Sequence, residues 1–377
     1  MRSTTLTLRE HGTGRAVLLV VSAIATTLAL ALIAMLASAS LLAVSACAQP
    51  VERYLLPAGR IEICDLAGTV RLTAGTGTRV EVFVTRGGPD GARLRIVQDQ
   101  RGDEARLHVI YPGNRVVYPR TGGWESTNLT VGPDGCLGHQ DRPGFGGHRV
   151  SIARSGFGLH AWADVEVRLP RGCRTTFRLG VGDVTARDVD GDLSIDVAAA
   201  PVNAGNTAGS LLVDTGSGAV TLSGHHGDLS VDTGSGAIEM SDVHGGRIKL
   251  DTGSGGVSAR AVEAGDLLVD TGSGAVDLDG VRSGGISVDT GSGGVRVGLA
   301  SAPRSLLVDT GSGGVTITGP AELGAEVDLE TGSGGIRSDY TMTVLSKDHD
   351  SLRGTIGDGR GRIKVDAGSG AVSLLKR

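Results

Sequence analysis

The sequence predicts an all-β protein whose main part is a parallel β-solenoid, a chain wound into stacked coils. A five-residue phrase, Asp-Thr-Gly-Ser-Gly, recurs at nearly constant spacing, and apolar and polar residues alternate on both sides of it. Glycine accounts for 62 of the 377 residues, while aromatic residues make up only 3 %. So few aromatic residues are atypical of a large globular core, but they suit a narrow interior of stacked Val, Leu and Ile.

The first fifty residues form a separate segment. Three arginines precede an almost uncharged run, residues 16–46, that is long enough to cross a bilayer. The run ends in Val-Ser-Ala-Cys, which resembles the lipobox of bacterial lipoproteins, so Cys47 is a candidate for lipidation. A retained single N-terminal transmembrane helix and simple secretion are the alternatives. In each case residues 51–377 lie outside the cytoplasm, attached to the membrane in the first two.

Charge and cysteine content restrict the function further. The formal net charge is −5 and no basic stripe is present, so we expect no nucleic-acid partner. Cys64, Cys136 and Cys173 form no pair or cluster with zinc spacing, so we expect no metal site on them. An extracytoplasmic setting permits one disulfide, for which we favour Cys136 with Cys173, although the sequence does not decide the pair. Alternatively, all three are small buried side chains.

The repeated phrase sets the length of a coil. Successive acids are 18, 19, 19, 19, 20, 21 and 36 residues apart, which predicts coils of 18–21 residues. The last interval is twice 18, as expected if one coil has lost its signature. The acids of the full and near copies are Asp214, Asp232, Asp251, Asp270, Asp289, Asp309, Glu330 and Asp366.

Each copy contains two short strands that meet at a glycine corner. In Leu229-Ser-Val231-Asp-Thr233 the alternation has the period of a half-buried strand, with the acid outward and the threonine inward. A unit of this size cannot bury its own apolar side, so each strand must pair in parallel with its equivalent one coil on. The usual crossover preference predicts a right-handed wind.

The domain organisation follows from where the repeats begin. Residues 1–50 are the signal or anchor segment, residues 51–175 a β-rich N-terminal cap or first irregular coils, and residues 176–377 the solenoid. Within the cap, the Gly/Pro-rich stretch 113–147 is an insertion that we expect to be a surface loop. Strands are predicted at residues 60–63, 69–72, 80–84, 93–97, 106–111, 149–152 and 164–169.

Several stretches together resemble the bacterial putative adhesin family. They are "GRIEICDLAGTVRLTAGTGTRVEVFV", "VEVRLPRG", the Asp-Thr-Gly-Ser-Gly coils and "LRGTIGDGRGRIKVDAGSGAVSL", and the resemblance covers roughly residues 58–377. It implies an exported or membrane-attached protein with β-strand repeats, largely without an assigned biochemical function, and the family name implies adhesion. The insertion at 113–147 departs from the family pattern, so nothing is carried over for it.

Taken singly, the phrase around Asp214 is similar to the catalytic loop of an aspartic peptidase. Such a peptidase needs two carboxylates that face each other and share a proton. Stacked coils are related by translation, so the eight acids form a row along the stack and we expect no catalytic residue among them. We expect a structural role instead, in which Asp214 accepts a hydrogen bond from the N–H of Gly216 at the corner. The glycines would supply positive φ or close backbone approach.

Two binding alternatives stay open at the level of sequence. Asp214, Asp232, Asp251, Asp270, Asp289 and Asp309 are weak candidates for calcium, because a row of carboxylates offers hard oxygen ligands. The histidines at 225, 226 and 244 are either solvated loop residues or, less favoured, a transition-metal site. We expect no other cofactor.

The outward row after the corner contains no side chain that could take part in catalysis. It consists of small residues only, namely Ala219, Ala237, Gly256, Ala275, Gly294, Gly314, Gly335 and Ala371. The sequence therefore predicts a non-enzymatic, adhesin-like structural or interaction module at the cell envelope. Its expected partners are the membrane and an envelope polymer or surface protein. The alternatives are a calcium-binding repeat protein and an extracytoplasmic hydrolase, either peptidase-like or a carbohydrate-active β-helix.

Overall fold

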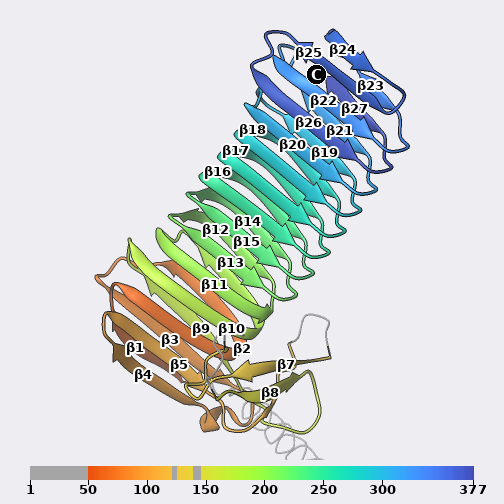
Figure 1. Cartoon of the computed structure of the whole chain (residues 1–377). Helices are drawn as coiled ribbons and strands as arrows, with labels where there is room; N and C mark the ends of the chain where they lie inside the picture. Colours follow the sequence, from red (N-terminus) through yellow and green to blue (C-terminus); the bar gives the residue numbers. More distant parts are fainter. Residues whose placement is uncertain (1–49, 121–124, 139–145) are drawn as a thin grey trace, which may run out of the picture. The chain divides into compact units, whose positions relative to one another are not determined.

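Parallel pairing between successive coils builds most of the structure, as the repeat spacing predicts (Figure 1). The computed structural model describes residues 50–120, 125–138 and 146–377. Within this part of the chain, 24 strands join one sheet and three form a second sheet. The only helical element among these residues is one 3-10 turn, η1 (Gly91–Arg93). The all-β class and the solenoid-like architecture are confirmed.

The strands of the N-terminal part are β1 (Val51–Pro57), β2 (Arg60–Ala74), β3 (Arg79–Gly87), β4 (Arg95–Arg101), β5 (Glu104–Ile110), β6 (Arg115–Val117), β7 (Ser126–Val131), β8 (His148–Ala153) and β9 (Trp162–Leu169). The first regular coils contain β10 (Cys173–Arg187), β11 (Gly191–Ala199), β12 (Val202–Ala208), β13 (Leu211–Thr215), β14 (Val220–His226), β15 (Leu229–Thr233), β16 (Ile238–Thr252), β17 (Val257–Thr271) and β18 (Val276–Thr290). The remaining strands are β19 (Val295–Leu299), β20 (Ser305–Thr310), β21 (Val315–Gly319), β22 (Ala325–Thr331), β23 (Ile336–Ser338), β24 (Thr343–Lys347), β25 (Ser351–Ile356), β26 (Gly361–Ala367) and β27 (Val372–Lys376).

Equivalent residues of neighbouring coils pair side by side. Asp232 pairs with Asp251, Asp251 with Asp270, and Asp289 with Asp309, and the flanking residues of each strand follow in the same register. In β16, β17 and β18 the second strand of one coil runs on into the first strand of the next. The chain bends within these long strands at one residue with left-handed backbone, φ 56° at Asp242, 51° at Ala261 and 67° at Gly280.

The core is a set of columns of aliphatic side chains inside the coils. One column contains Val231, Leu250, Val269, Val288 and Val308, each at most 3 % exposed. Since every coil contributes one residue of similar size to each column, the side chains stack along the axis and no large aromatic residue is needed.

The second glycine of each corner lies where two backbones touch. A Cβ atom on Gly274, Gly293 or Gly313 would stand 1.8 Å from the carbonyl oxygen of the equivalent glycine in the preceding coil. None of these glycines has positive φ. Of the two roles that the sequence left open for the corner glycines, close approach therefore holds at this position and positive φ does not.

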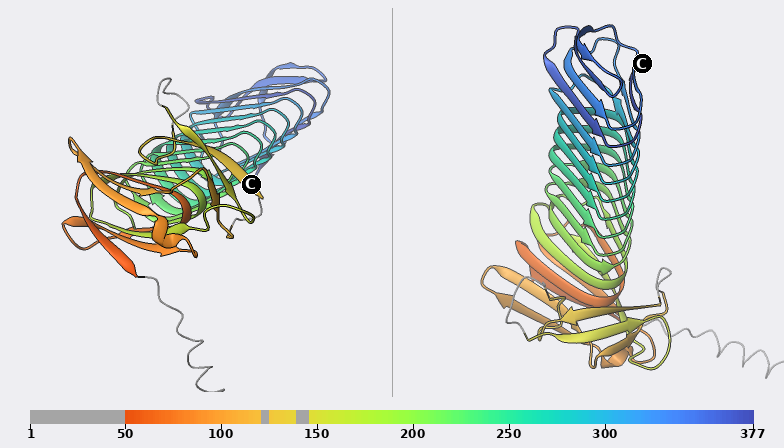
Figure 2. Two further views of the ribbon diagram at one scale, coloured as in Figure 1. Left: turned by 90° about the horizontal axis from the view of Figure 1, so that it is seen from below. Right: turned by 45° about the vertical axis from the view of Figure 1, so that its right-hand side comes forward.

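The N-terminal end of the stack is formed by residues far apart in the sequence. Strand β2 pairs in parallel with β10 on one side, and with β5 and β9 on the other (Figure 1). Residues 60–74 are thus a regular coil, and β5 and β9 share the coil beyond it. The antiparallel strands β1, β3 and β4 extend this end, with β4 on β5, β3 on β9 and β1 on β3 (Figure 2). They pair backbone groups that the last parallel coil would otherwise expose.

The C-terminal end departs from sequence order. Strand β26 lies between β20 and β22, and β27 lies between β21 and β23, so residues 361–376 are inserted between two earlier coils. Residues 343–356 form the antiparallel hairpin β24–β25, and β25 pairs antiparallel with β22. We expected one further coil without the repeated phrase in the 36-residue interval. This expectation was wrong, because residues 343–356 form a hairpin at the end of the stack instead.

The Gly/Pro-rich insertion is not only a loop. Its residues contribute β6 and β7, which pair with β8 in the second, three-stranded sheet. Val116, Val117 and Tyr118 are buried there, at most 2 % exposed. The expectation of a surface loop over 113–147 was wrong for these strands, since the abundance of Gly and Pro concealed the short apolar runs between them.

The predicted signal or anchor segment, with Cys47, lies outside the described residues. Among those that are described, no helix combines the length and the apolar character that a membrane crossing requires.

We predict that alanine at two adjacent glycines of one corner changes the free energy of unfolding by very different amounts. Gly293→Ala places a methyl group 1.8 Å from the Gly274 carbonyl oxygen and should lower the free energy of unfolding by about 3 kcal/mol. Gly294→Ala, whose nearest atom would be 3.7 Å away, should change it by less than about 1 kcal/mol. Urea unfolding followed by circular dichroism measures both, and equal effects would contradict the close-contact interpretation.

Candidate functional site

The acids of the repeated phrase form one continuous row on the outside of the stack, called the acid row here. In the order of the stack it comprises Asp196, Asp214, Asp232, Asp251, Asp270, Asp289, Asp309, Asp366 and Glu330. Toward the N-terminal end the same row continues with Arg178, Cys64 and His108. The row therefore changes character, from carboxylates to a cation, a sulfur and an imidazole.

The threonine of the repeated phrase makes hydrogen bonds that stabilise the corner. The buried hydroxyl of Thr271 donates to the carbonyl of Gly255 at 3.0 Å and accepts from the N–H of Gly274 at 3.0 Å. The same pair of bonds recurs at Thr233, Thr252, Thr290, Thr310 and Thr331. The first glycine of the corner, such as Gly272, donates its N–H to a threonine carbonyl of the preceding coil at 3.2 Å. This N–H is thus used in the pairing between coils, and the N–H of Gly216 likewise donates to the carbonyl of Val197 at 3.1 Å. The Asx turn at Asp214 stays a prediction.

Parallel pairing makes the acid row a line of like charges. Partial burial raises the pKa of Asp289, and the carboxylates of Asp270 and Asp309 raise it further. Two carboxylates about 5 Å apart repel by roughly 1 kcal/mol even in water. Lys249 offsets part of this charge through an ion pair with Asp251 at 3.2 Å. Acids related by translation point the same way, so no two of this row face each other as a peptidase pair must.

A second outward row runs beside the acid row, and the two together are called the first-strand face here. This mixed row comprises Ser194, Leu212, Ser230, Lys249, Leu268, Ser287, Leu307, Lys364 and Asp328. Leu212, Leu268 and Leu307 are 45 %, 38 % and 42 % exposed. Apolar side chains thus recur at solvent along a face that is otherwise polar.

The three histidines of the return segments do not act together. His225 is buried, with its Nδ1 2.9 Å from the hydroxyl of Thr207, and burial lowers its pKa. His226 stacks on His244 with ring centroids 5.1 Å apart, and His244 pairs with Asp242 and Glu263. Within the described part of the chain, they belong to no cluster of three metal-ligand groups. The expectation of solvated loop residues was wrong for His225.

A polar cleft of about 270 Å³ lies at the N-terminal end of the first-strand face. Glu62, in β2, lies where the mixed row continues toward the N-terminal end of the stack. It makes ion pairs with Arg178 and, at 3.3 Å, with Arg106. Interaction with His108 lowers the pKa of Glu62 most, and Arg178 and Arg106 lower it further. Together they outweigh burial and bring it to about 2. The cleft is lined by Glu62, Arg101, Glu104, Arg106, Gly132, Asp134, Cys136, Leu137, Gly138 and Arg178.

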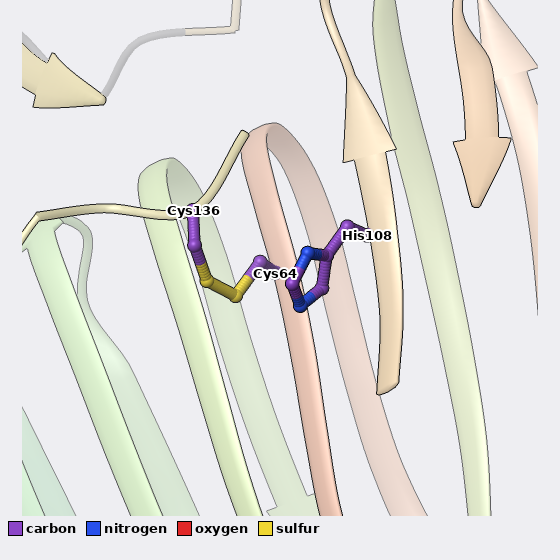
Figure 3. Close-up of side chains that lie close together, drawn as sticks. All are labelled: Cys64, His108 and Cys136. Carbon is purple, nitrogen blue, oxygen red and sulfur yellow. A yellow bond between two sulfur atoms is a disulfide. The ribbon is translucent and has the colours of Figure 1, made fainter. Parts of the chain in front are cut away.

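Cys136 joins Cys64 in a disulfide at this cleft, with Cα atoms 5.3 Å apart (Figure 3). Cys173 is free and buried, so the favoured pairing of Cys136 with Cys173 was wrong. His108 lies beside the disulfide because β2 and β5 pair in parallel with Cys64 opposite His108. These three residues could hold a metal ion: their ligand atoms lie within 4.8 Å of one another, and all three are buried.

His108 is held by polar groups on two sides. Its Nδ1 is 3.0 Å from the carbonyl oxygen of Asp134, and its Nε2 is 3.7 Å from a carboxylate oxygen of Glu62. Burial opposes protonation of the ring, but the Glu62 carboxylate and the Asp134 carbonyl outweigh it and raise the pKa above 6.5. The sequence did not reveal this group, because no local spacing indicates that residues 60–64 pair with residues 104–108.

Asp65, next to Cys64, is fully buried. One carboxyl oxygen accepts bonds from the hydroxyl of Tyr111 at 2.7 Å and from the N–H of Leu66 at 2.8 Å. The other carboxyl oxygen has no hydrogen-bond partner among the described residues. Burial raises the pKa of Asp65 to about 8, against the lowering effect of these bonds. The carboxyl is therefore largely protonated at neutral pH.

Comparison with known proteins places the repeat region in a family. The family described as Toastrack DUF4097 matches residues 162–375, more than half of the chain. No curated protein matches the sequence. Among solved structures, a putative cell adhesion protein from Clostridium sporogenes has 10 % identity and a TM-score of 0.19, covering 87 % of this chain and 99 % of its own. A putative adhesin from Parabacteroides merdae has 12 % identity and a TM-score of 0.34, covering 86 % and 95 %.

We predict that the threonine of a corner stabilises the fold more than its aspartate. Thr271→Val removes two hydrogen bonds and leaves the N–H of Gly274 without its acceptor, so it should cost about 1–3 kcal/mol. Asp270→Asn removes an exposed charge from the acid row and should change stability by less than about 0.5 kcal/mol. Urea unfolding of both variants provides the measurement. A larger loss for Asp270→Asn would return the corner role to the aspartate.

We also predict that Asp65 makes the stability depend on pH. Its pKa is about 8 in the folded chain, against 3.8 for an ordinary aspartate as in the unfolded chain, so only the folded state keeps the proton between these values. The contribution of Asp65 to stability should therefore be fully present below pH 3.8 and fall by up to about 1.4 kcal/mol per pH unit as the pH rises to 8.

Asp65→Asn should remove this contribution, because an amide does not titrate. The difference in unfolding free energy between variant and wild type, measured from pH 4 to 8, isolates it from the contributions of the other titratable groups. Asp277→Asn, at an exposed site, is the control. A pH-independent difference for Asp65→Asn would show that Asp65 is ionised throughout.

Proposed function

Because the chain belongs to the Toastrack DUF4097 family, we propose that residues 51–377 are an adhesin-like, non-enzymatic interaction module outside the cytoplasm, attached to the bacterial membrane. The supporting observation is the first-strand face, in which equivalent outward side chains recur at every coil. Translation along the stack gives each of them many equivalents, and a surface of this kind suits recognition of an extended partner.

The composition of this face favours a partner with its own repeat. Three exposed leucines lie in the mixed row beside the acid row: Leu268 is three coils from Leu212, and Leu307 is two coils further on, at about 4.8 Å per coil. Isolated leucines supply contact area, while the carboxylates and hydroxyls can bind donors of a polymer. An envelope polymer, such as a cell-wall glycan, is the partner that we propose, and a surface protein is the alternative.

The compartment is supported by chemistry at the other end of the stack. A disulfide such as Cys64–Cys136 persists in oxidising compartments, which lie outside the cytoplasm. The apolar run before residue 47 supplies the proposed attachment, through lipidated Cys47 or a single transmembrane helix.

Calcium binding by the acid row is a second candidate. The pKa of Asp289 is raised by partial burial and further by repulsion from Asp270 and Asp309, and a divalent cation between successive carboxylates would relieve that repulsion. In this case the chain would need calcium to bind its polymer.

A binding assay with envelope glycans, run with calcium and with a chelator, tests the proposal. We expect saturable binding that falls at least tenfold in Leu212→Asn/Leu268→Asn/Leu307→Asn, because the first-strand face loses its exposed apolar groups. The matched control, Glu239→Gln/Asp277→Asn/Arg296→Gln, changes exposed residues of another outward row and should bind normally.

Equal loss in both triple variants would contradict the assignment to the first-strand face. Loss of binding in chelator would support the calcium candidate. Turnover of a glycan or peptide that disappears on changing one acid of the row would overturn the non-enzymatic proposal in favour of a hydrolase.

A further inference from the structure

Two sulfur atoms and one imidazole nitrogen, all possible metal ligands, lie close together beside the polar cleft. The sulfur atoms of Cys64 and Cys136 and a ring nitrogen of His108 lie within 4.8 Å of one another (Figure 3). They come from β2, from the segment after β7, and from β5, so three separate parts of the chain bring them together. Cys64 is 1 %, Cys136 4 % and His108 5 % exposed.

The orientation of His108 leaves one nitrogen available as a ligand. A carbonyl oxygen can only accept, so the Nδ1 that lies 3.0 Å from the Asp134 carbonyl carries the hydrogen. In the neutral ring Nε2 then has a lone pair, and it is buried without a hydrogen-bond partner among the described residues. A backbone carbonyl that fixes one nitrogen while the other is available is the usual arrangement of a metal-binding histidine.

A cation lies beside one of the two cysteines. The guanidinium Nη1 of Arg178 is 3.8 Å from the sulfur of Cys136, where it can offset the negative charge of a metal-bound sulfur. Cys136 lines the polar cleft, which gives a reductant a route to the disulfide. Glu62, 3.7 Å from the His108 Nε2, is the nearest carboxylate for a fourth ligand position.

We propose that Cys64, Cys136 and His108 form a redox-gated metal site, closed as a disulfide and opened by reduction to bind a thiophilic cation such as Zn²⁺. Two sulfurs and one imidazole nitrogen are a ligand set that zinc accepts, with a fourth position left for a carboxylate or water. A disulfide with a purely structural role does not require an imidazole beside it.

The redox step balances with a dithiol as reductant. Thiol–disulfide exchange breaks the Cys64–Cys136 bond, transfers two electrons and two protons to its sulfurs, and leaves the reductant as a disulfide. Metal binding then releases the two thiol protons to solvent. Exchange with a small disulfide, which takes up two electrons and two protons and becomes a dithiol, re-forms the Cys64–Cys136 bond and releases the metal.

The test uses the full chain with Cys47→Ala and Cys173→Ala, so that Cys64 and Cys136 are the only cysteines of the four. A phosphine reduces the disulfide, taking up the oxygen of one water as phosphine oxide, and is removed without air. Co²⁺ is then titrated at pH 8, where protons compete less for His108. We expect one Co²⁺ per reduced chain, with thiolate-to-cobalt charge-transfer absorption and tetrahedral d–d bands, and none for the oxidised chain. Zn²⁺ should displace the Co²⁺.

His108→Asn is the matched variant, because an asparagine side chain can still donate to the Asp134 carbonyl but has no nitrogen in the place of Nε2. It should weaken Co²⁺ binding at least tenfold and change the d–d bands, while Cys64→Ser should remove the charge-transfer band. Circular dichroism checks that each reduced chain stays folded. If Cys173→Ala does not fold, the same comparison is made with Cys173 retained.

A folded, reduced chain that binds no stoichiometric Co²⁺ would overturn the proposal, as would binding that His108→Asn leaves unchanged. Equal binding by the oxidised chain would show that the metal uses groups other than the two thiolates, and would likewise overturn it. Unfolding on reduction alone would establish a structural disulfide in place of a metal site.

Discussion

The close approach of neighbouring backbones at the glycine corner is the constraint on which the rest of the structure depends. At Gly293 and its equivalents no side chain fits, since a Cβ would stand 1.8 Å from a carbonyl oxygen of the adjacent coil. Coils can therefore stack at strand spacing, and the hydroxyl of a threonine such as Thr271 can span two of them. The aliphatic columns and the outward rows follow from the same translation, because every equivalent side chain must lie beside the next.

The regular part of this fold could be predicted from the sequence, and its ends could not. The period of 18 to 20 residues and the alternation in segments such as 229–233 determined the register and placed Asp outward and Thr inward. The insertion of residues 361–376 between two earlier coils has no local signal, because any coil has the same alternation. The pairing of β2 with β10 likewise joins residues far apart, and so does the Cys64–Cys136 disulfide.

The candidate sites divide in the same way. The sequence analysis named every member of the acid row except Asp196, but it could not show that the glycine N–H groups are used in pairing between coils. The buried polar group at the other end was not predicted. Glu62, His108 and Asp65 are scattered in strands that read as ordinary half-buried segments, and only the pairing of β2 with β5 brings Cys64 to His108. A repeated outward face and a single, non-repeated polar cluster at its end thus both result from parallel pairing between coils.

The claim that successive coils are related by translation is tested most directly by distances along the stack. Spin labels on the corner serine Ser217 and, in turn, on Ser292, Ser312, Ser369 and Ser333 can be measured in pairs by double electron–electron resonance. Stacking in the observed order predicts separations that grow by about 4.8 Å per coil, with Ser369 at about 29 Å and Ser333 at about 34 Å. Separations that do not increase evenly, or a Ser333 nearer to Ser217 than Ser369 is, would contradict the account.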